Sequence, residues 1–471
     1  MAYGHRPMYP EYKLRKLSHR NLYFLENGKV YDSDGALIER LDDADGLLKF
    51  VRDFRASLFT GTLVQSFTSQ FLPGLLHLGQ RILCNKKGKP LGARLRCGRE
   101  TRWISTCENW HEVAEPGVIE RMWEHYEHMG VGFAPTPGSL GNKFMLKVYE
   151  REGLKRHSSL SIAAETFIHE HAVGGLAYTP GMGHYNQIQY MDMCAAYLRW
   201  FRKQPDGAAV RIPDGNVTGL ATYLCRCTIV VHSDLALGPF PVKGIRNHKP
   251  KVFYPTLPGV YEDVYLSKER VEECRRVGCD VSVHEGFGWR NFTSDNEACA
   301  RELFRLRQEA PSKHVQEKTK VTALAPIGRH GMRREHQYLV DQEHSEPTDE
   351  CVLNDYGEPL NYYIHSESDN KSAYMTHWWW YTVDQCNLAV YFFALPYAQQ
   401  GRLVAIDFDS IFVLEGSDKH KYVKKYSREA AACQAGDWQW LDLHNVNILG
   451  DRTFESDEMT RKPGQVKSAV V

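Results

Sequence analysis

The sequence predicts a globular chain that mixes α-helices with β-strands. Two short apolar runs within residues 403–413 are rich in β-branched and aromatic residues, which is typical of strands. Apolar residues recur at helical spacing in residues 268–278 and 294–310, and residues 372–395 form a long aromatic segment that also reads as a helix. The length of 471 residues leaves room for two or three compact units.

The runs within residues 403–413 flank two aspartates, Asp407 and Asp409, and a tight turn between them would make a β-hairpin with both carboxylates at its tip. The apolar arms can be buried, whereas unpaired carboxylates are costly to bury. A divalent cation would resolve this conflict because hard cations prefer carboxylate oxygens. The alternative is a surface hairpin with a solvated acidic turn.

The hairpin resembles the third polymerase motif of family B DNA polymerases, Tyr-x-Asp-Thr-Asp-Ser. Both aspartates and Ser410 are present, while Ala405 replaces the tyrosine and Phe408 the threonine. One short motif is weak support by itself. The other motifs of the family are therefore expected upstream and downstream, in order.

The first motif of the family, Asp-x-x-Ser-Leu-Tyr-Pro, resembles residues 192–198, in which Asp192 and Tyr197 keep their spacing. Gly174 and Gly175 precede it and resemble the Tyr-x-Gly-Gly element that links the exonuclease and polymerase regions in protein-primed members. These similarities extend the resemblance to the protein-primed branch.

The second motif, Lys-x-x-x-Asn-Ser-x-Tyr-Gly, survives here in Lys320 and Gly328, while apolar residues replace its Asn, Ser and Tyr. Arg452 and Phe454 stand where the family has Lys-x-Tyr. In all, the resemblance covers residues 165–455 approximately. The departures gather in the region that contacts the incoming nucleotide.

The resemblance implies an α+β fold, a polymerase right hand with a ferredoxin-like antiparallel palm, helical fingers and a reduced thumb. It divides the chain into an exonuclease-like N-terminal α/β domain (1–155), a first palm part with a connector (156–300), fingers (301–345), a second palm part with the catalytic hairpin (346–430), and the palm end with a thumb remnant (431–471).

The activity that the resemblance implies is template-directed addition of deoxynucleotides to a primer 3′ end by two-metal phosphoryl transfer. Asp192, Asp407 and Asp409 would be the catalytic residues and the ligands of two Mg²⁺ ions, with Mn²⁺ as an alternative. The expected nucleotide-binding residues are Lys320, Tyr197, Arg307 and Lys313, with Tyr197 selecting deoxynucleotides by its bulk. The expected DNA-binding residues are Gly174, Gly175, Gly328, Arg452 and Phe454.

The expected partners are primer-template DNA and deoxynucleoside triphosphates, together with a terminal protein or a processivity partner. The family's exonuclease begins with Asp-x-Glu on a strand, and no Asp-x-Glu occurs before residue 160, so we expect no proofreading. Little chain follows Phe454, so a small thumb and a weak grip on DNA are expected.

Lysine plus arginine and aspartate plus glutamate number 58 each, so the chain is neutral, and a DNA track would need basic residues clustered on one face. Such runs occur within residues 86–102, 246–251 and 329–334. Any single run is more often a solvated face, but their joint presence beside the polymerase-like motifs favours a DNA track. The 12 cysteines contain no Cys-x-x-Cys pair, which favours free thiols in a reducing compartment. No apolar run is long enough to span a membrane, so no membrane-spanning segment is expected. The resemblance implies a protein of a virus, phage or mobile element that acts in the host cytoplasm.

Alternatives remain at several positions. His169 and His171 would share one face of a strand, where a structural role is favoured over a metal pair. Trp378, Trp379 and Trp380 are expected in a helical core rather than as a platform for bases. For the whole chain, the rivals are an inactive polymerase-like scaffold that binds DNA and a template-independent nucleotidyltransferase.

Overall fold

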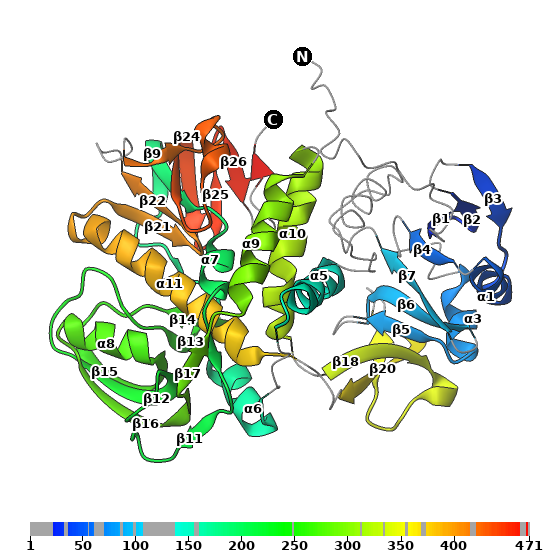
Figure 1. The fold of residues 1–471 in the computed structure, drawn as a ribbon, viewed down its shortest axis with the longest axis horizontal. Coiled ribbons are helices and arrows are strands. Elements are labelled where there is room, and N and C mark those ends of the chain that lie inside the picture. Colours follow the sequence, from blue (N-terminus) through cyan, green and yellow to red (C-terminus); the bar gives the residue numbers. More distant parts are fainter. Residues whose placement is uncertain are drawn as a thin grey trace. The chain divides into compact units, whose positions relative to one another are not determined.

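The fold of the chain, seen in a computed structural model, is drawn in Figure 1. The structure describes residues 22–32, 36–54, 56–60, 70–84, 88–97, 100–106, 137–154, 160–246, 249–310, 313–332, 335–353, 357–368, 374–414, 421–461 and 468–469. The chain forms two compact units. The first unit comprises residues 1–148, 305–326 and 333–372, and the second unit comprises residues 149–304, 327–332 and 373–471.

The first unit is built on a mixed sheet of 10 strands among its described residues. In spatial order these are β19 (Glu350–Leu353), β20 (Pro359–Ser368), β18 (Glu335–Asp341), β5 (Arg81–Cys84), β6 (Pro90–Cys97), β7 (Glu100–Thr106), β4 (Ser57–Thr60), β1 (Leu22–Glu26), β2 (Lys29–Tyr31) and β3 (Leu37–Arg40). β4 runs parallel to both β1 and β7, and the other described pairs in this sheet are antiparallel.

Two helices, α1 (Ala44–Asp53) and α3 (Leu72–His77), supply apolar residues to the core of this sheet. Asp43 begins α1 by accepting a hydrogen bond from the Gly46 amide at 2.7 Å, which satisfies one of the unpaired donors at the start of the helix. Leu47, Phe50 and Val51 recur at helical spacing and are buried. The apolar spacing in this segment is thus that of a helix with one face buried in the core.

The polar composition of residues 333–362 favours a loop or a small insertion. Instead β18 and β20 pair along seven residues each, and β18 joins β5. Leu339 and Ile364 are buried in the core of the first unit, whereas polar residues of the same strands, such as His336 and Gln337, are partly exposed. Strands with so many polar residues have a low mean hydropathy, so composition alone hides them.

The second unit contains the acidic hairpin in an antiparallel sheet. In spatial order its strands are β27 (Ser468–Ala469), β26 (Met459–Arg461), β25 (Thr453–Glu455), β24 (Trp438–Gly450), β9 (Gly183–Met193), β22 (Ser410–Leu414), β21 (Leu403–Asp407) and β8 (Ala177–Tyr178). A short strand, β23 (Val423–Lys424), pairs in parallel with β24. The hairpin of β21 and β22 is the one that the sequence predicts.

The long helix α11 (Thr376–Gln399) packs on this sheet, as the aromatic segment predicts (Figure 1). Its residues Cys386, Val390 and Ala394 share one core with Ile406 and Ile411 of the hairpin. Trp378 and Trp380 are buried, so the expectation that they pack in a core is confirmed. A helix that is apolar on most faces needs partners on several sides.

A further sheet of the second unit follows the order β11 (Val210–Ile212), β16 (Asp280–Trp289), β12 (Thr222–Val231) and β15 (Gly259–Ser267). Helix α8 (Lys268–Arg276) covers it through Val271 and Cys274. The smaller pairs in this unit are β10 (Gln204–Asp206) with β17 (Asn291–Thr293), and β13 (Val242–Arg246) with β14 (Lys249–Phe253).

The remaining helices are α5 (Pro137–Arg151), α6 (Ile162–His171), α7 (Ala196–Phe201), α9 (Asn296–Gln308) and α10 (Lys313–His330). Helix α10 continues past Pro326, although proline usually ends or kinks a helix. His169 and His171 lie on α6 rather than on a strand, so they do not share a face; His171 stacks on Tyr265 at 3.7 Å between ring centroids. None of the helices in the described segments combines the length and apolar character that crossing a bilayer requires.

A buried ion pair joins α8 to α11. The Arg270 guanidinium donates to Asp384, and Ser267 Oγ donates to the other carboxylate oxygen at 2.6 Å. Arg270 also donates to the Pro239 carbonyl at 2.8 Å. Arg270 and Asp384 are 1% and 5% exposed, so each charge depends on its partner for stabilisation.

We expect Asp384→Ala to destabilise the second unit by about 3–5 kcal/mol, because it leaves a buried guanidinium without its counter-charge. Urea unfolding followed by circular dichroism would show an earlier transition. The control is Glu272→Ala, which removes an exposed carboxylate 4.0 Å from Lys268 and should change stability by less than about 0.5 kcal/mol. Equal effects of the two substitutions would contradict this assignment.

Candidate active site

The candidate site lies where β9 pairs with β22. Asp192 lies directly opposite Ser410, and the Met193 amide donates to the Asp409 carbonyl at 2.9 Å. Asp407 in turn pairs with Ser410 across the hairpin. Backbone pairing therefore brings Asp192 next to Asp407 and Asp409, although more than two hundred residues separate them along the chain.

The tip of the hairpin is held in a strained conformation. Phe408 has a φ of 60°, which is unusual for a bulky residue and is more often adopted by glycine in a two-residue turn. Its amide donates to the Leu176 carbonyl at 2.7 Å, and Ser410 Oγ donates to the Asp407 carbonyl at 2.9 Å. Such outliers persist where surrounding contacts fix them and are frequent at functional sites.

The loop that contains Gly174 and Gly175 packs beside this tip. Asn387 of α11 donates to the Gly174 carbonyl at 3.0 Å and accepts from the Leu176 amide at 2.8 Å. A Cβ on Gly175 would lie 2.1 Å from Cδ1 of Phe408, whereas a Cβ on Gly174 would meet nothing within 4 Å. Gly175 is thus required by the close approach of the Phe408 ring.

Both carboxylate oxygens of Asp192 have partners. Tyr190 donates its hydroxyl to Oδ1 at 2.9 Å, and the Lys425 ammonium group donates to Oδ2. Burial raises the pKa of Tyr190 well above its usual range, and the negative charge of Asp192 adds to the rise. Tyr190 therefore keeps its proton and remains a donor to Asp192.

Lys425 was not recognised from the sequence. It follows another lysine in a polar segment, and nothing in that pattern distinguishes the partly buried Lys425 from the exposed Lys424. A lysine is recognisable as a partner of Asp192 only after β23 and β24 are placed beside β9.

Tyr197 lies on α7, close to the hairpin. Burial raises the pKa of its hydroxyl well above the usual range, and the charges of Asp409 and Asp407 contribute to the rise while Arg452 opposes it. The charges of these three groups therefore influence the Tyr197 hydroxyl.

Arg452 is exposed and stacks over the Phe408 ring, with Cζ 4.3 Å from the ring centroid. Phe454, in contrast, is 2% exposed and packs edge-on against Phe412 at 4.8 Å. A ring in this core has no exposed face for the expected primer contact.

The expected phosphate-binding residues lie on α9 and α10. Arg307 is partly buried near the end of α9, and Lys320 is exposed on α10. Lys313 begins α10, but its side chain lies outside the described part of the structure. These three residues belong to the first unit, and their contacts with a triphosphate stay predictions. Gly328, also on α10, belongs to the second unit and has open space around it.

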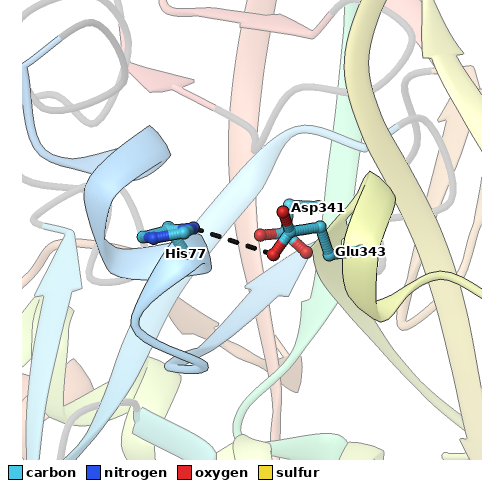
Figure 2. Close-up of side chains that lie close together, drawn as sticks. All are labelled: His77, Asp341 and Glu343. Carbon is cyan, nitrogen blue, oxygen red and sulfur yellow. Dashed lines mark ion pairs between the residues drawn. The ribbon is translucent and has the colours of Figure 1, made fainter.

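The described side chains include potential metal ligands whose donor atoms lie close together. Among the described residues, one group of three or more has its ligand atoms all within 4.8 Å: His77, Asp341 and Glu343 of the first unit (Figure 2). Its members are exposed or partly exposed, and His77 Nδ1 lies 4.0 Å from the Glu343 carboxylate. Asp341 is also engaged by the amide and ring of His344.

Asp192, Asp407 and Asp409 have the donor chemistry that hard divalent cations prefer and lie on paired strands. In the described structure, however, they do not form a group with all ligand atoms within 4.8 Å. The side chain of Asp192 is turned to Lys425 and Tyr190 instead. The strand pairing thus places the three aspartates as a divalent site would need, but their carboxylate groups would have to move closer together to share an ion.

The chain has the fold of a DNA polymerase. A structure of phi29 DNA polymerase in an orthorhombic crystal form matches with a TM-score of 0.65 and 12% identity, covering 94% of this chain and 86% of that one. The same polymerase complexed with primer-template DNA and incoming nucleotides matches with a TM-score of 0.68 and 12% identity, covering 93% and 88%. No family model and no curated protein matches the sequence.

We expect Gly175→Ala to displace the Phe408 ring and to destabilise the second unit by about 1–3 kcal/mol, because the new Cβ overpacks a rigid neighbour. The measurement is the midpoint of thermal unfolding. Gly174→Ala is the matched control and should leave the midpoint near that of the wild type. A Gly175→Ala midpoint equal to that of Gly174→Ala would show that the two positions are equally tolerant.

Proposed function

We propose that the chain is a template-directed DNA polymerase that adds deoxynucleotides to a primer 3′ end. The observation that carries the proposal is the pairing of β9 with β22, which sets Asp192 beside the Asp407–Asp409 turn in a chain with a polymerase fold. Carboxylates at one point of a sheet are costly unless cations balance them. Phosphoryl transfer needs such a concentration of cations and their ligands.

In the proposed reaction, the primer 3′ oxygen attacks the α-phosphorus of the nucleotide and pyrophosphate leaves. Asp192, Asp407 and Asp409 would hold two Mg²⁺ ions, which supply charge neutralisation for the attacking and leaving oxygens. The chain itself would hold these ligands in position. The hairpin fixes Asp407 at the end of β21 and Asp409 in the turn, and β9 fixes Asp192.

Tyr197 and Arg452 would line the place where the new base pair forms. The raised pKa keeps the Tyr197 hydroxyl neutral, so it adds bulk without a negative charge beside the sugar. That bulk would exclude a 2′-hydroxyl and select deoxynucleotides. Stacking on Phe408 would direct the Arg452 guanidinium toward the primer phosphates.

The triphosphate needs its own cations. Lys320 is the first choice for this contact, with Arg307 and Lys313 as further candidates, all of them on the proposed fingers helices α9 and α10. Primer-template DNA and deoxynucleoside triphosphates are the proposed substrates, and a terminal protein or a processivity partner is a further proposed partner.

A second candidate is a polymerase-like scaffold that binds DNA without extending it. One observation favours it: Lys425 already balances Asp192, and the aspartates are not gathered as closely as bound ions would require. Primer extension separates the candidates, since a scaffold incorporates nothing with any divalent ion. Extension without template would indicate a template-independent nucleotidyltransferase.

Asp409→Asn is expected to lower nucleotide incorporation by at least about a hundredfold while leaving the fold intact, because it removes a charge needed to hold the cations. Primer extension resolved on a gel measures this. Asp457→Asn, at an exposed carboxylate outside the site, is the control and should extend normally. Normal extension by Asp409→Asn would remove the hairpin from the catalytic site.

We also expect no proofreading. The first strand of the first unit, β1, carries Phe24-Leu25-Glu26, so a buried aromatic residue stands two positions before the glutamate. A two-metal exonuclease needs a carboxylate there by resemblance. Purified protein incubated with Mg²⁺ and a labelled single strand should leave the 3′ end intact. Metal-dependent trimming of that strand would overturn this expectation.

A further inference from the structure

Lys425 is a cation built into the candidate site. Its ammonium group donates to Oδ2 of Asp192, and the two side chains are 15% and 17% exposed. The same group lies 5.0 Å from the centroid of the Tyr190 ring and 5.7 Å from that of Tyr426, where aromatic faces attract cations. The ion pair is thus largely shielded from water, and it is stronger than an exposed pair would be.

The backbone holds Lys425 in this position. Its amide donates to the Trp440 carbonyl at 2.7 Å, and the preceding residue, Lys424, pairs with Trp440 in the β23–β24 ladder. Trp440 pairs in turn with Met191, and Gln439 pairs with Asp192. Lys425 thus directly follows β23, which pairs with β24, and β24 pairs in turn with β9.

The neighbouring Lys424 is a contrasting case. It is exposed, and its ammonium group lies 5.5 Å from the centroid of the Trp440 ring. No described carboxylate forms an ion pair with it. Two adjacent lysines thus differ in one respect that matters here, which is contact with Asp192.

A divalent ion and an ammonium group cannot both approach Asp192 Oδ2 closely without strong repulsion. Each is attracted by the same negative charge, and Tyr190 already occupies Oδ1. Binding of the ion at Asp192 must therefore move the ammonium group away or carry the cost of keeping it near. The aspartates would come together only as that exchange proceeds.

We propose that Lys425 is the resident counter-ion of Asp192 and that a divalent cation binds Asp192 in exchange for the Lys425 ammonium group. This inference rests on the proposed function, because it concerns the same carboxylates. In the free protein, the Lys425 ammonium group then competes with a metal ion for Asp192. The exchange gives the site a resting state in which its charge is balanced without metal.

The test is direct binding of Mn²⁺ to the full-length protein, measured from the signal of free Mn²⁺ in electron paramagnetic resonance, with no DNA or nucleotide present. Lys425→Met removes the charge but keeps an apolar stem against Tyr190 and should bind Mn²⁺ about tenfold or more tightly than wild type. Lys425→Arg keeps the charge and should bind as wild type does. Lys424→Met is the matched control and should also leave binding unchanged.

A second substitution locates the gained affinity. In the Lys425→Met background, Asp192→Asn should abolish the tighter binding, because the released carboxylate is its source. Circular dichroism verifies folding, and Lys425→Gln, with the same expected tightening, replaces Lys425→Met if the latter unfolds. Unchanged or weaker Mn²⁺ binding in the folded neutral variant would overturn the inference.

Primer extension by the wild type keeps this inference separate from the proposed function. Extension together with unchanged Mn²⁺ affinity in Lys425→Met would reject the counter-ion and keep the polymerase. Tighter Mn²⁺ binding without any extension by the wild type would support the counter-ion and reject the polymerase.

Discussion

The pairing of β9 with β22 is the constraint on which the site depends. It sets Asp192 opposite Ser410 and ties the Met193 amide to the Asp409 carbonyl. A slip of one residue would turn Asp192 to the other face of the sheet. Buried residues on both strands, Tyr190 and Met191 on β9 and Ile411 and Phe412 on β22, resist such a slip because each face has its own core.

Near this strand pairing, contacts among neighbouring side chains take the place of residues that the family B motifs have and this chain lacks. Phe408 stands where a threonine was expected, and its ring fills the space that Gly175 leaves open. Arg452 stacks over the same ring. Phe408 therefore connects the glycine loop, the hairpin and the segment that follows β24, and its strained φ is stabilised by these neighbours.

Much of the second unit could be predicted from local pattern. The apolar arms of the hairpin and the aromatic run of α11 are long and regular, and both elements form where expected. The strands β18 and β20 could not be predicted because they are rich in polar residues and because β18 pairs with β5, which is far away in the sequence. His169 and His171 were placed on a strand because a three-residue pattern cannot separate a helix from a strand. Lys425 was not predicted as a site residue because its partner, Asp192, is distant in the sequence.

The proposed function depends on one cation site formed by Asp192, Asp407 and Asp409. The most direct measurement is a crystal structure of the chain with primer-template DNA, a non-hydrolysable nucleotide and Mn²⁺, in which anomalous scattering locates the metal. We expect anomalous peaks between the Asp192 and Asp409 carboxylates, with Lys425 withdrawn from Asp192. A nucleotide-bound structure in which Mn²⁺ is absent from this point, with Lys425 still on Asp192, would contradict it.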